Sequence, residues 1–247
     1  MLTLPVAATA VLAGLLIGVT GVGGVLLVPA LTELASVPVE RAVAASMMAF
    51  LLGGTVAAFA HARHADVSRN LVLPLCISAA AGAALGAASL TILGPDVVRL
   101  VISVTAFSSG LQALVAPRTV SGERIPSANG LGVLGVLVGY GSAISGTGGP
   151  ALLVPLLLLF RAPVRVAIFL ALAVQVPISL SATAVNLVSG RIDYALAAAL
   201  SVLVLAGTMA GSFISRAISR RVVTVAVAII LVLVGGWYGA SSISRLL

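Results

Sequence analysis

The chain has 247 residues, of which 61% are hydrophobic and only 8% are charged, and its mean hydropathy is +1.27. So few charges cannot cover the surface of a soluble domain, and apolar stretches of about 20 residues recur along the whole length. The composition therefore indicates an all-α polytopic membrane protein and excludes a soluble enzyme. The formal charge of +7 rests on arginine alone, and it fits both loop charge that sets orientation in the membrane and a positive potential that attracts anions.

Apolar segments fall into two similar groups along the chain. They cover roughly 3–34, 42–60, 71–93 and 97–116, and then 130–160, 164–188, 194–215 and 222–243. Glycines recur 125 residues apart: Gly21 matches Gly146, and Gly110 matches Gly235. We predict an internal duplication, with a first repeat over 1–116, a cytoplasmic linker over 117–129 and a second repeat over 130–247.

The first segment of each half is interrupted by a glycine cluster. The clusters are Gly21, Gly23 and Gly24 after Thr20, and Gly146, Gly148 and Gly149 after Ser145, with Thr147 between them. Backbone that leaves a helix inside lipid must be buried in protein or line a cavity. Two such breaks, one per half, are the sequence pattern typical of a transport site.

Arginine placement favours one topology. If all eight segments cross the membrane, six arginines face one side and seven the other, which sets no orientation. If the first segment of each half turns at its glycines and leaves on the side it entered, each half crosses three times and the halves are inverted. Nine arginines then share the side of the linker and four lie opposite, which places the linker in the cytoplasm. The nine are Arg63, Arg69, Arg118, Arg124, Arg161, Arg165, Arg216, Arg220 and Arg221, and the four are Arg41, Arg99, Arg191 and Arg245.

Neutral groups are the candidate ligands, because no acid lies deep in an apolar segment. A half-helix that begins after a glycine turn presents free N–H groups to an anion. The predicted substrate site joins the two clusters with Ser46 and Gln175, and it needs no metal or cofactor. Its residues are Thr20, Gly21, Gly23, Gly24, Ser46, Ser145, Gly146, Thr147, Gly148, Gly149 and Gln175.

Other polar or small residues have simpler interpretations. We expect the Gly82/Gly86 and Gly207/Gly211 pairs to let helices approach closely. Ser46 could equally bond back to its own helix. Asn186 is interpreted as a helix cap, and His61 and His64 as a solvated end of the second segment.

The duplicated Gly-x-Gly-Gly runs, each followed by an apolar stretch and a proline, resemble the TauE/SafE sulfite exporter family. The resemblance covers essentially the whole chain and includes the loop Gly190 to Tyr194. It implies a multi-pass protein of the bacterial inner membrane that moves sulfite, organosulfonates or related anions. The family often has a third consecutive glycine where Val25 and Pro150 stand here, and Ala171 stands at the second-half position that matches Ser46.

We therefore expect a secondary anion transporter whose partners are a small anion and the lipid bilayer, with no nucleic acid. The sequence leaves open whether the protein forms a homo-oligomer. Three alternatives remain: a channel-like facilitator, a membrane accessory protein, and an intramembrane enzyme that uses Ser145. The last lacks a histidine placed to act as its base.

Overall fold

The computed structural model describes residues 3–62, 67–115, 126–214 and 220–246, and this described part is helical without strands. The first half contains α1 (Leu4–Thr20), a 3-10 turn η1 (Gly24–Leu26), α2 (Leu27–Leu34), α3 (Val39–Ala62), α4 (Arg69–Ser89) and α5 (Pro95–Val115). The second half contains α6 (Ala128–Ser145), α7 (Pro150–Leu159), α8 (Val164–Val188), α9 (Tyr194–Ile214) and α10 (Arg220–Leu246). The predicted all-α class is confirmed.

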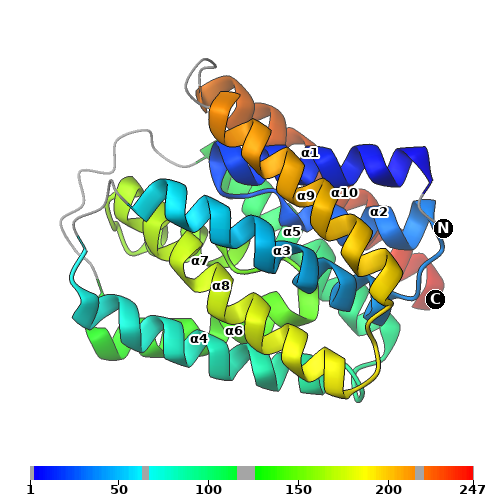
Figure 1. Cartoon of the computed structure of the whole chain (residues 1–247), viewed down its shortest axis with the longest axis horizontal. Coiled ribbons are helices and arrows are strands. Elements are labelled where there is room, and N and C mark those ends of the chain that lie inside the picture. The colour runs from blue at the N-terminus through cyan, green and yellow to red at the C-terminus, as the bar shows by residue number, and fades with distance from the viewer. Residues whose placement is uncertain (1–2, 63–66, 116–125, 215–219, 247) are drawn as a thin grey trace.

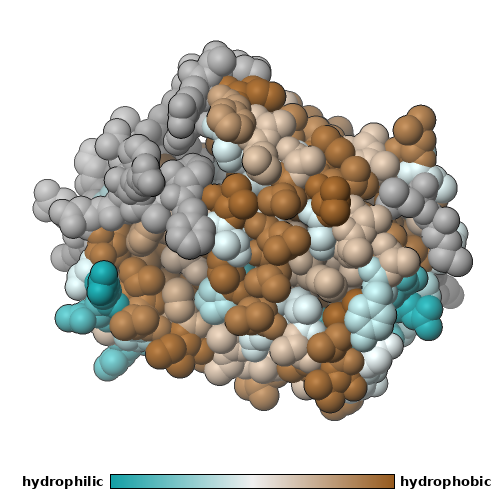
Figure 2. Space-filling view, viewed as in Figure 1, coloured by the Kyte–Doolittle hydropathy of each residue, from teal (hydrophilic) through white to brown (hydrophobic). Residues whose placement is uncertain are grey.

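The surface is that of a protein that sits in lipid. Seven of the described helices, α3, α4, α5, α6, α8, α9 and α10, are long and apolar enough to cross a membrane. Figure 2 shows apolar residues across the middle of one face and hydrophilic residues gathered toward its two opposite ends. Helices satisfy their own backbone hydrogen bonds, which is why this architecture suits a hydrocarbon environment.

The helices run between two ends of the molecule (Figure 1). One end, which we call the terminal end, holds the start of α1, the end of α10, and the starts of α3, α5 and α9. The opposite end, the linker end, holds the starts of α4, α6, α8 and α10. Each helix of the first half therefore runs opposite to its counterpart in the second half.

The first segment of each half forms a hairpin. The α1 helix starts at the terminal end, and α2 brings the chain back there to begin α3 (Figure 1). In the same way α6 starts at the linker end and α7 returns to it before α8 begins. The α6 helix is long enough to cross by itself, but the α6–α7 unit enters and leaves at one end, as the re-entrant alternative requires.

Helix boundaries and pairings repeat between the halves. The helices α3, α4 and α5 begin 125 residues before α8, α9 and α10. The α1 helix packs against α9, and its counterpart α6 packs against α4, so each half covers the first helix of the other. The pairs α3–α8 and α5–α10 join equivalent helices. This is the pattern that the predicted duplication would produce, although the duplication itself stays a prediction.

Glycines make the cross-half contacts possible. A methyl group on Gly82 or Gly86 would collide with the carbonyl oxygen of Val136 or Tyr140 on α6. The equivalent pair on α9, Gly207 and Gly211, faces carbonyl oxygens of α1, those of Val11 and Leu15, in the same way. The GxxxG pairs therefore act in close helix packing, as the sequence predicts.

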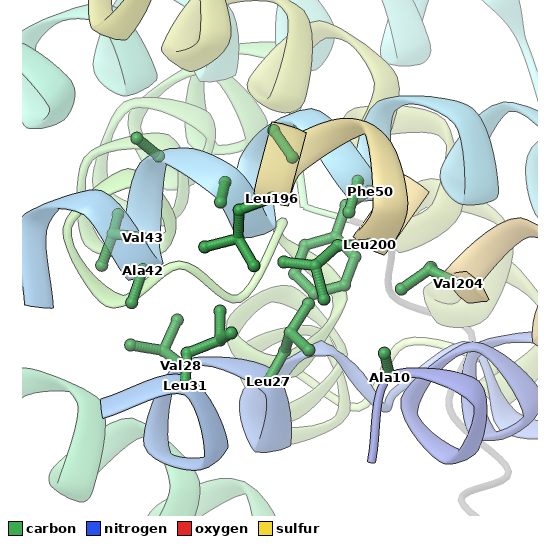
Figure 3. Packing of buried hydrophobic residues seen from close by; sticks show 14 of the residues in the cluster. Ala10, Leu27, Val28, Leu31, Ala42, Val43, Phe50, Leu196, Leu200 and Val204 are labelled. Carbon is green, nitrogen blue, oxygen red and sulfur yellow. The ribbon is translucent and has the colours of Figure 1, made fainter. Parts of the chain in front are cut away.

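One apolar cluster joins α1, α2, α3 and α9 around the first hairpin (Figure 3). Figure 3 shows Val28 and Leu31 of α2 directed toward Ala42 and Val43 of α3. The Phe50 side chain of the same helix is fully buried in this cluster. The cluster thus fixes the short helix α2 against a full-length span.

Two predictions concern residues that the structure covers only in part. The predicted linker over 117–129 is described from residue 126 onward, and its remainder lies outside the described residues. His64 also lies outside them, while His61 belongs to the last turn of α3.

The packing role of the glycine pairs can be tested by melting temperature. Gly82→Ala should lower the stability by about 1–3 kcal/mol, because the added methyl group meets backbone that cannot rotate away. Gly132→Ala on α6 is the matched control: no atom lies within 4 Å of its added methyl group. The control should be neutral or raise the melting temperature, since alanine favours a helix over glycine. Equal melting temperatures for both variants would contradict the packing role.

The topology can be tested with single cysteines in a Cys76→Ala background. Ser127 and Arg161 are exposed at the linker end, and Ile92 and Val188 are exposed at the terminal end. Cysteines at the first two positions should react with a membrane-impermeant maleimide from one side, which the arginine distribution makes the cytoplasm. Cysteines at the other two should react from the opposite side. Labelling of positions 127 and 161 from different sides would rule out the hairpin topology.

Candidate functional site

The first glycine turn ends α1 and begins a short return helix. Gly21 caps α1 in the left-handed conformation, with φ 77°, and its N–H donates to the carbonyl of Ile17 at 2.9 Å. Glycine is the residue that adopts this cap without a steric penalty. Gly23 follows with φ −161° and ψ −18°, and Gly24 opens the 3-10 turn that leads into α2. Thr20, Gly21, Gly23 and Gly24 thus form one continuous turn.

The second turn has the same plan but a more constrained backbone. Gly146 caps α6 with φ 69°, and Gly148 and Gly149 follow with φ 80° and φ 117°. Gly149 is the residue before Pro150, which begins α7. Proline suits the first helical position because its missing N–H would have no helical partner there. Three left-handed glycines in four residues make this turn intolerant of side chains.

The two turns meet inside the protein. A methyl group added to Gly24 would lie 2.8 Å from the carbonyl oxygen of Thr147 and 2.9 Å from the Phe50 ring. Gly146 in turn lies against Val28 of α2 and Val43 of α3. The glycines of both turns are buried, so the break in each half is enclosed by protein, as a membrane environment requires.

Main-chain donors at the turns have no partner. Of the described residues, none accepts a hydrogen bond from the N–H of Gly23, Gly148 or Gly149. Buried amides are nearly always bonded, so a group of free ones indicates a place for a ligand or water. These amides also precede α2 and α7, whose dipoles favour negative charge at that end.

The hydroxyls at the turns are already engaged. The Thr20 hydroxyl lies 2.8 Å from the Leu16 carbonyl and 3.0 Å from the Val22 carbonyl, and it accepts from the Val22 N–H. The Ser145 hydroxyl donates to Gly141 at 2.7 Å and lies 3.0 Å from the Thr147 hydroxyl. In this arrangement these three hydroxyls brace the turns, whereas the amides of Gly23, Gly148 and Gly149 and the buried hydroxyl of Ser142 on α6 have no partner.

Ser46 of α3 and Gln175 of α8 are the remaining predicted site residues, and Gln175 contacts the second turn. Ser46 is buried, but its hydroxyl donates to Ala42 of its own helix at 2.7 Å, which is the simpler of its two predicted roles. Gln175 is 1% exposed and packs on Gly54 of α3, and its side chain lies 3.6 Å from a methyl group added to Gly148. Its Oε1 atom has no hydrogen-bond partner. Gln175 therefore adjoins the second turn with unused bonding capacity.

Phe50 is a component that sequence reasoning missed. Its ring contacts the positions of both Gly24 and Gly148, so it closes the first turn against the second. Phe50 and Gln175 stand 125 residues apart, at equivalent places in the two halves. This 125-residue spacing from Gln175 is the sequence signal that could have identified Phe50. Phe50 of α3 and Gln175 of α8 thus both lie against Gly148 of the second turn.

Carboxylates stay away from this junction. Glu40 and Asp96 lie in the first turns of α3 and α5, and Asp193 caps α9 by accepting the Leu196 N–H at 3.0 Å. Glu33 lies next to the end of α2, and Asp66 lies outside the described residues. Within the described part, no three histidines, cysteines or acids gather as a metal site would need. The arrangement can hold a small anion through neutral donors.

Comparison with known proteins agrees with this architecture. The family model described as sulfite exporter TauE/SafE matches residues 6–238, which include both glycine turns. A search of curated proteins and a search of solved structures each return no match. Because the match covers nearly the whole chain, it includes both glycine turns, six of the seven long helices in full and most of α10. The chain therefore belongs to the TauE/SafE sulfite exporter family, a family of membrane transporters.

Proposed function

We propose that the protein is a secondary transporter of small anions, with sulfite or organosulfonates as substrates, in the bacterial inner membrane. The anion is held where the two glycine turns meet, among the predicted site residues from Thr20 to Gly24 and from Ser145 to Gly149. Gln175 completes the site from α8, and Ser46 adjoins it from α3.

The observation that carries this proposal is the group of unpartnered amides at Gly23, Gly148 and Gly149. Backbone N–H groups bind an oxyanion without adding a fixed positive charge, so the site can release its ligand as well as capture it. A small tetrahedral or pyramidal anion can accept from several of them at once. The inverted hairpins offer one turn to each end of the molecule, as alternating access requires.

A channel-like facilitator is the second candidate. It is favoured by the position of the described carboxylates, all of which lie at or next to helix ends. Proton- or sodium-coupled carriers commonly hold such a group inside the membrane. Uptake of labelled sulfite into proteoliposomes, with and without a proton gradient, separates the candidates: a coupled carrier concentrates the anion, and a facilitator only equilibrates it.

The glycine turns can be tested by ligand-induced thermal shift with sulfite and methanesulfonate. Gly149→Ala should abolish the shift, because alanine is strained at φ 117° and the turn must rearrange. Gly24→Ala should abolish it by pushing Phe50 and the Thr147 carbonyl apart. Gly132→Ala, in open space on α6, should keep the full shift. Full shifts in both turn variants would place the site elsewhere.

The role of carboxylates can be tested in the same liposomes. Asp193→Asn should retain most transport, since asparagine caps a helix about as well as aspartate. Asp96→Asn should retain most transport as well, since Asp96 lies in the first turn of α5. Asp66→Asn should behave alike. Complete loss of transport in one of them, at normal expression, would show that an acid at a helix end performs the coupling instead of the backbone site.

A further inference from the structure

A buried arginine stands apart from the proposed site. Arg191 is 8% exposed, in the loop between α8 and α9 at the terminal end. Its Nη1 atom donates to the Ala87 carbonyl of α4 at 2.8 Å and to Oδ1 of Asn186 at 2.9 Å. None of the described carboxylates forms an ion pair with it. Burying a guanidinium charge in this way costs free energy unless a negative charge pairs with it.

Two donors beside this guanidinium have no partner. They are Nη2 of Arg191 and Nδ2 of Asn186, and both are buried. The Asn186 side chain is fully buried, and it does not cap a helix as the sequence suggested, because its oxygen accepts from Arg191. The Oδ1–Nη1 bond joins the two side chains, so their unpartnered N–H groups belong to one buried pair of residues. Such a pair matches the oxygens of a sulfite, sulfonate or carboxylate.

The same face of α8 leads from this pair to the glycine turns. Gln175, Ser179, Thr183 and Asn186 are three or four residues apart, so they share one face of the helix. Each has a buried side-chain atom without a partner. Most other buried hydroxyls, such as those of Ser46, Ser201 and Thr208, bond back to their own helices. The row on α8 is therefore unusual within the described structure.

Three of the four equivalent positions of the first half are apolar or small. The residues 125 positions earlier than Gln175, Ser179, Thr183 and Asn186 are Phe50, Gly54, Ala58 and His61. Because the halves run in opposite directions, the polar row of α8 leads to the terminal end, and the row of α3 leads to the linker end and is polar only at His61. The stretch next to the turns therefore differs in polarity between the two halves.

We propose that Arg191 and Asn186 form a second oxyanion site, at the terminal end of the polar row on α8. It takes the same class of anion as the turns and passes it along the row to them. The link to the turns rests on the proposed function, whereas the binding of an anion to Arg191 and Asn186 does not.

The test measures binding stoichiometry with ³⁵S-labelled sulfite, kept anaerobic, on the purified full-length protein. The wild type should bind two sulfite ions per chain. Asn186→Asp should bind one: the aspartate keeps the bridge to Nη1 of Arg191 but adds a negative charge where the anion would lie. Its melting temperature without sulfite should not fall, because the bridge becomes an ion pair. Arg41→Gln, which removes an exposed arginine of α3 at the same end, should still bind two.

The outcomes separate the two proposals. If the wild type binds only one ion, or if Asn186→Asp still binds two while Gly149→Ala binds one, Arg191 and Asn186 hold no anion and Arg191 only anchors the loop to α4. If Asn186→Asp binds one ion while Gly149→Ala still binds two, the second site stands and the proposed site at the turns fails. Arg191→Lys provides a further check, since lysine keeps the charge without the guanidinium fork; it should weaken the second site at least about tenfold. An unchanged affinity in Arg191→Lys would contradict recognition by the fork.

Discussion

A backbone amide that leaves a helix inside a bilayer finds no water to bond with, and this constraint organises the whole molecule. The two glycine turns place such amides within the protein, where Phe50, Gln175 and the facing turn enclose them. Enclosure needs full-length helices around each hairpin, and those helices approach closely through glycine pairs. The turns can therefore stay buried only because α1 packs on α9 and α6 packs on α4.

The fold was largely predictable from the sequence because its signals are local or periodic. Apolar runs placed the spans, and the glycine clusters placed the interruptions between α1 and α2 and between α6 and α7. The charge distribution pointed to hairpins before any geometry was known. Segment ends were less well predicted: α3 begins at Val39 and α4 at Arg69, before the apolar runs do, because polar residues extend both helices beyond the hydrocarbon.

The candidate site was predictable only in outline, because its contacts join residues far apart in the chain. Nothing around Phe50 distinguishes it from other apolar residues of α3 until the second turn is brought against it. Asn186 was misread for the same reason, since its partner is set by how the loop to α9 folds back over α4. The engagement of the Thr20 and Ser145 hydroxyls could not be read from their proximity to glycine.

The exchange of partners between the halves also bears on how the chain is made. The partner of α1 is α9, whose first residue follows Thr20 by 174 positions. At about 5–20 residues per second, α1 waits roughly 10–35 s in the membrane before that partner is synthesised. During this interval its Gly14 and Gly18 groove faces lipid or the insertion machinery. The first hairpin therefore completes its packing only after α9 is synthesised, and the N-terminal half alone lacks the helix that covers α1.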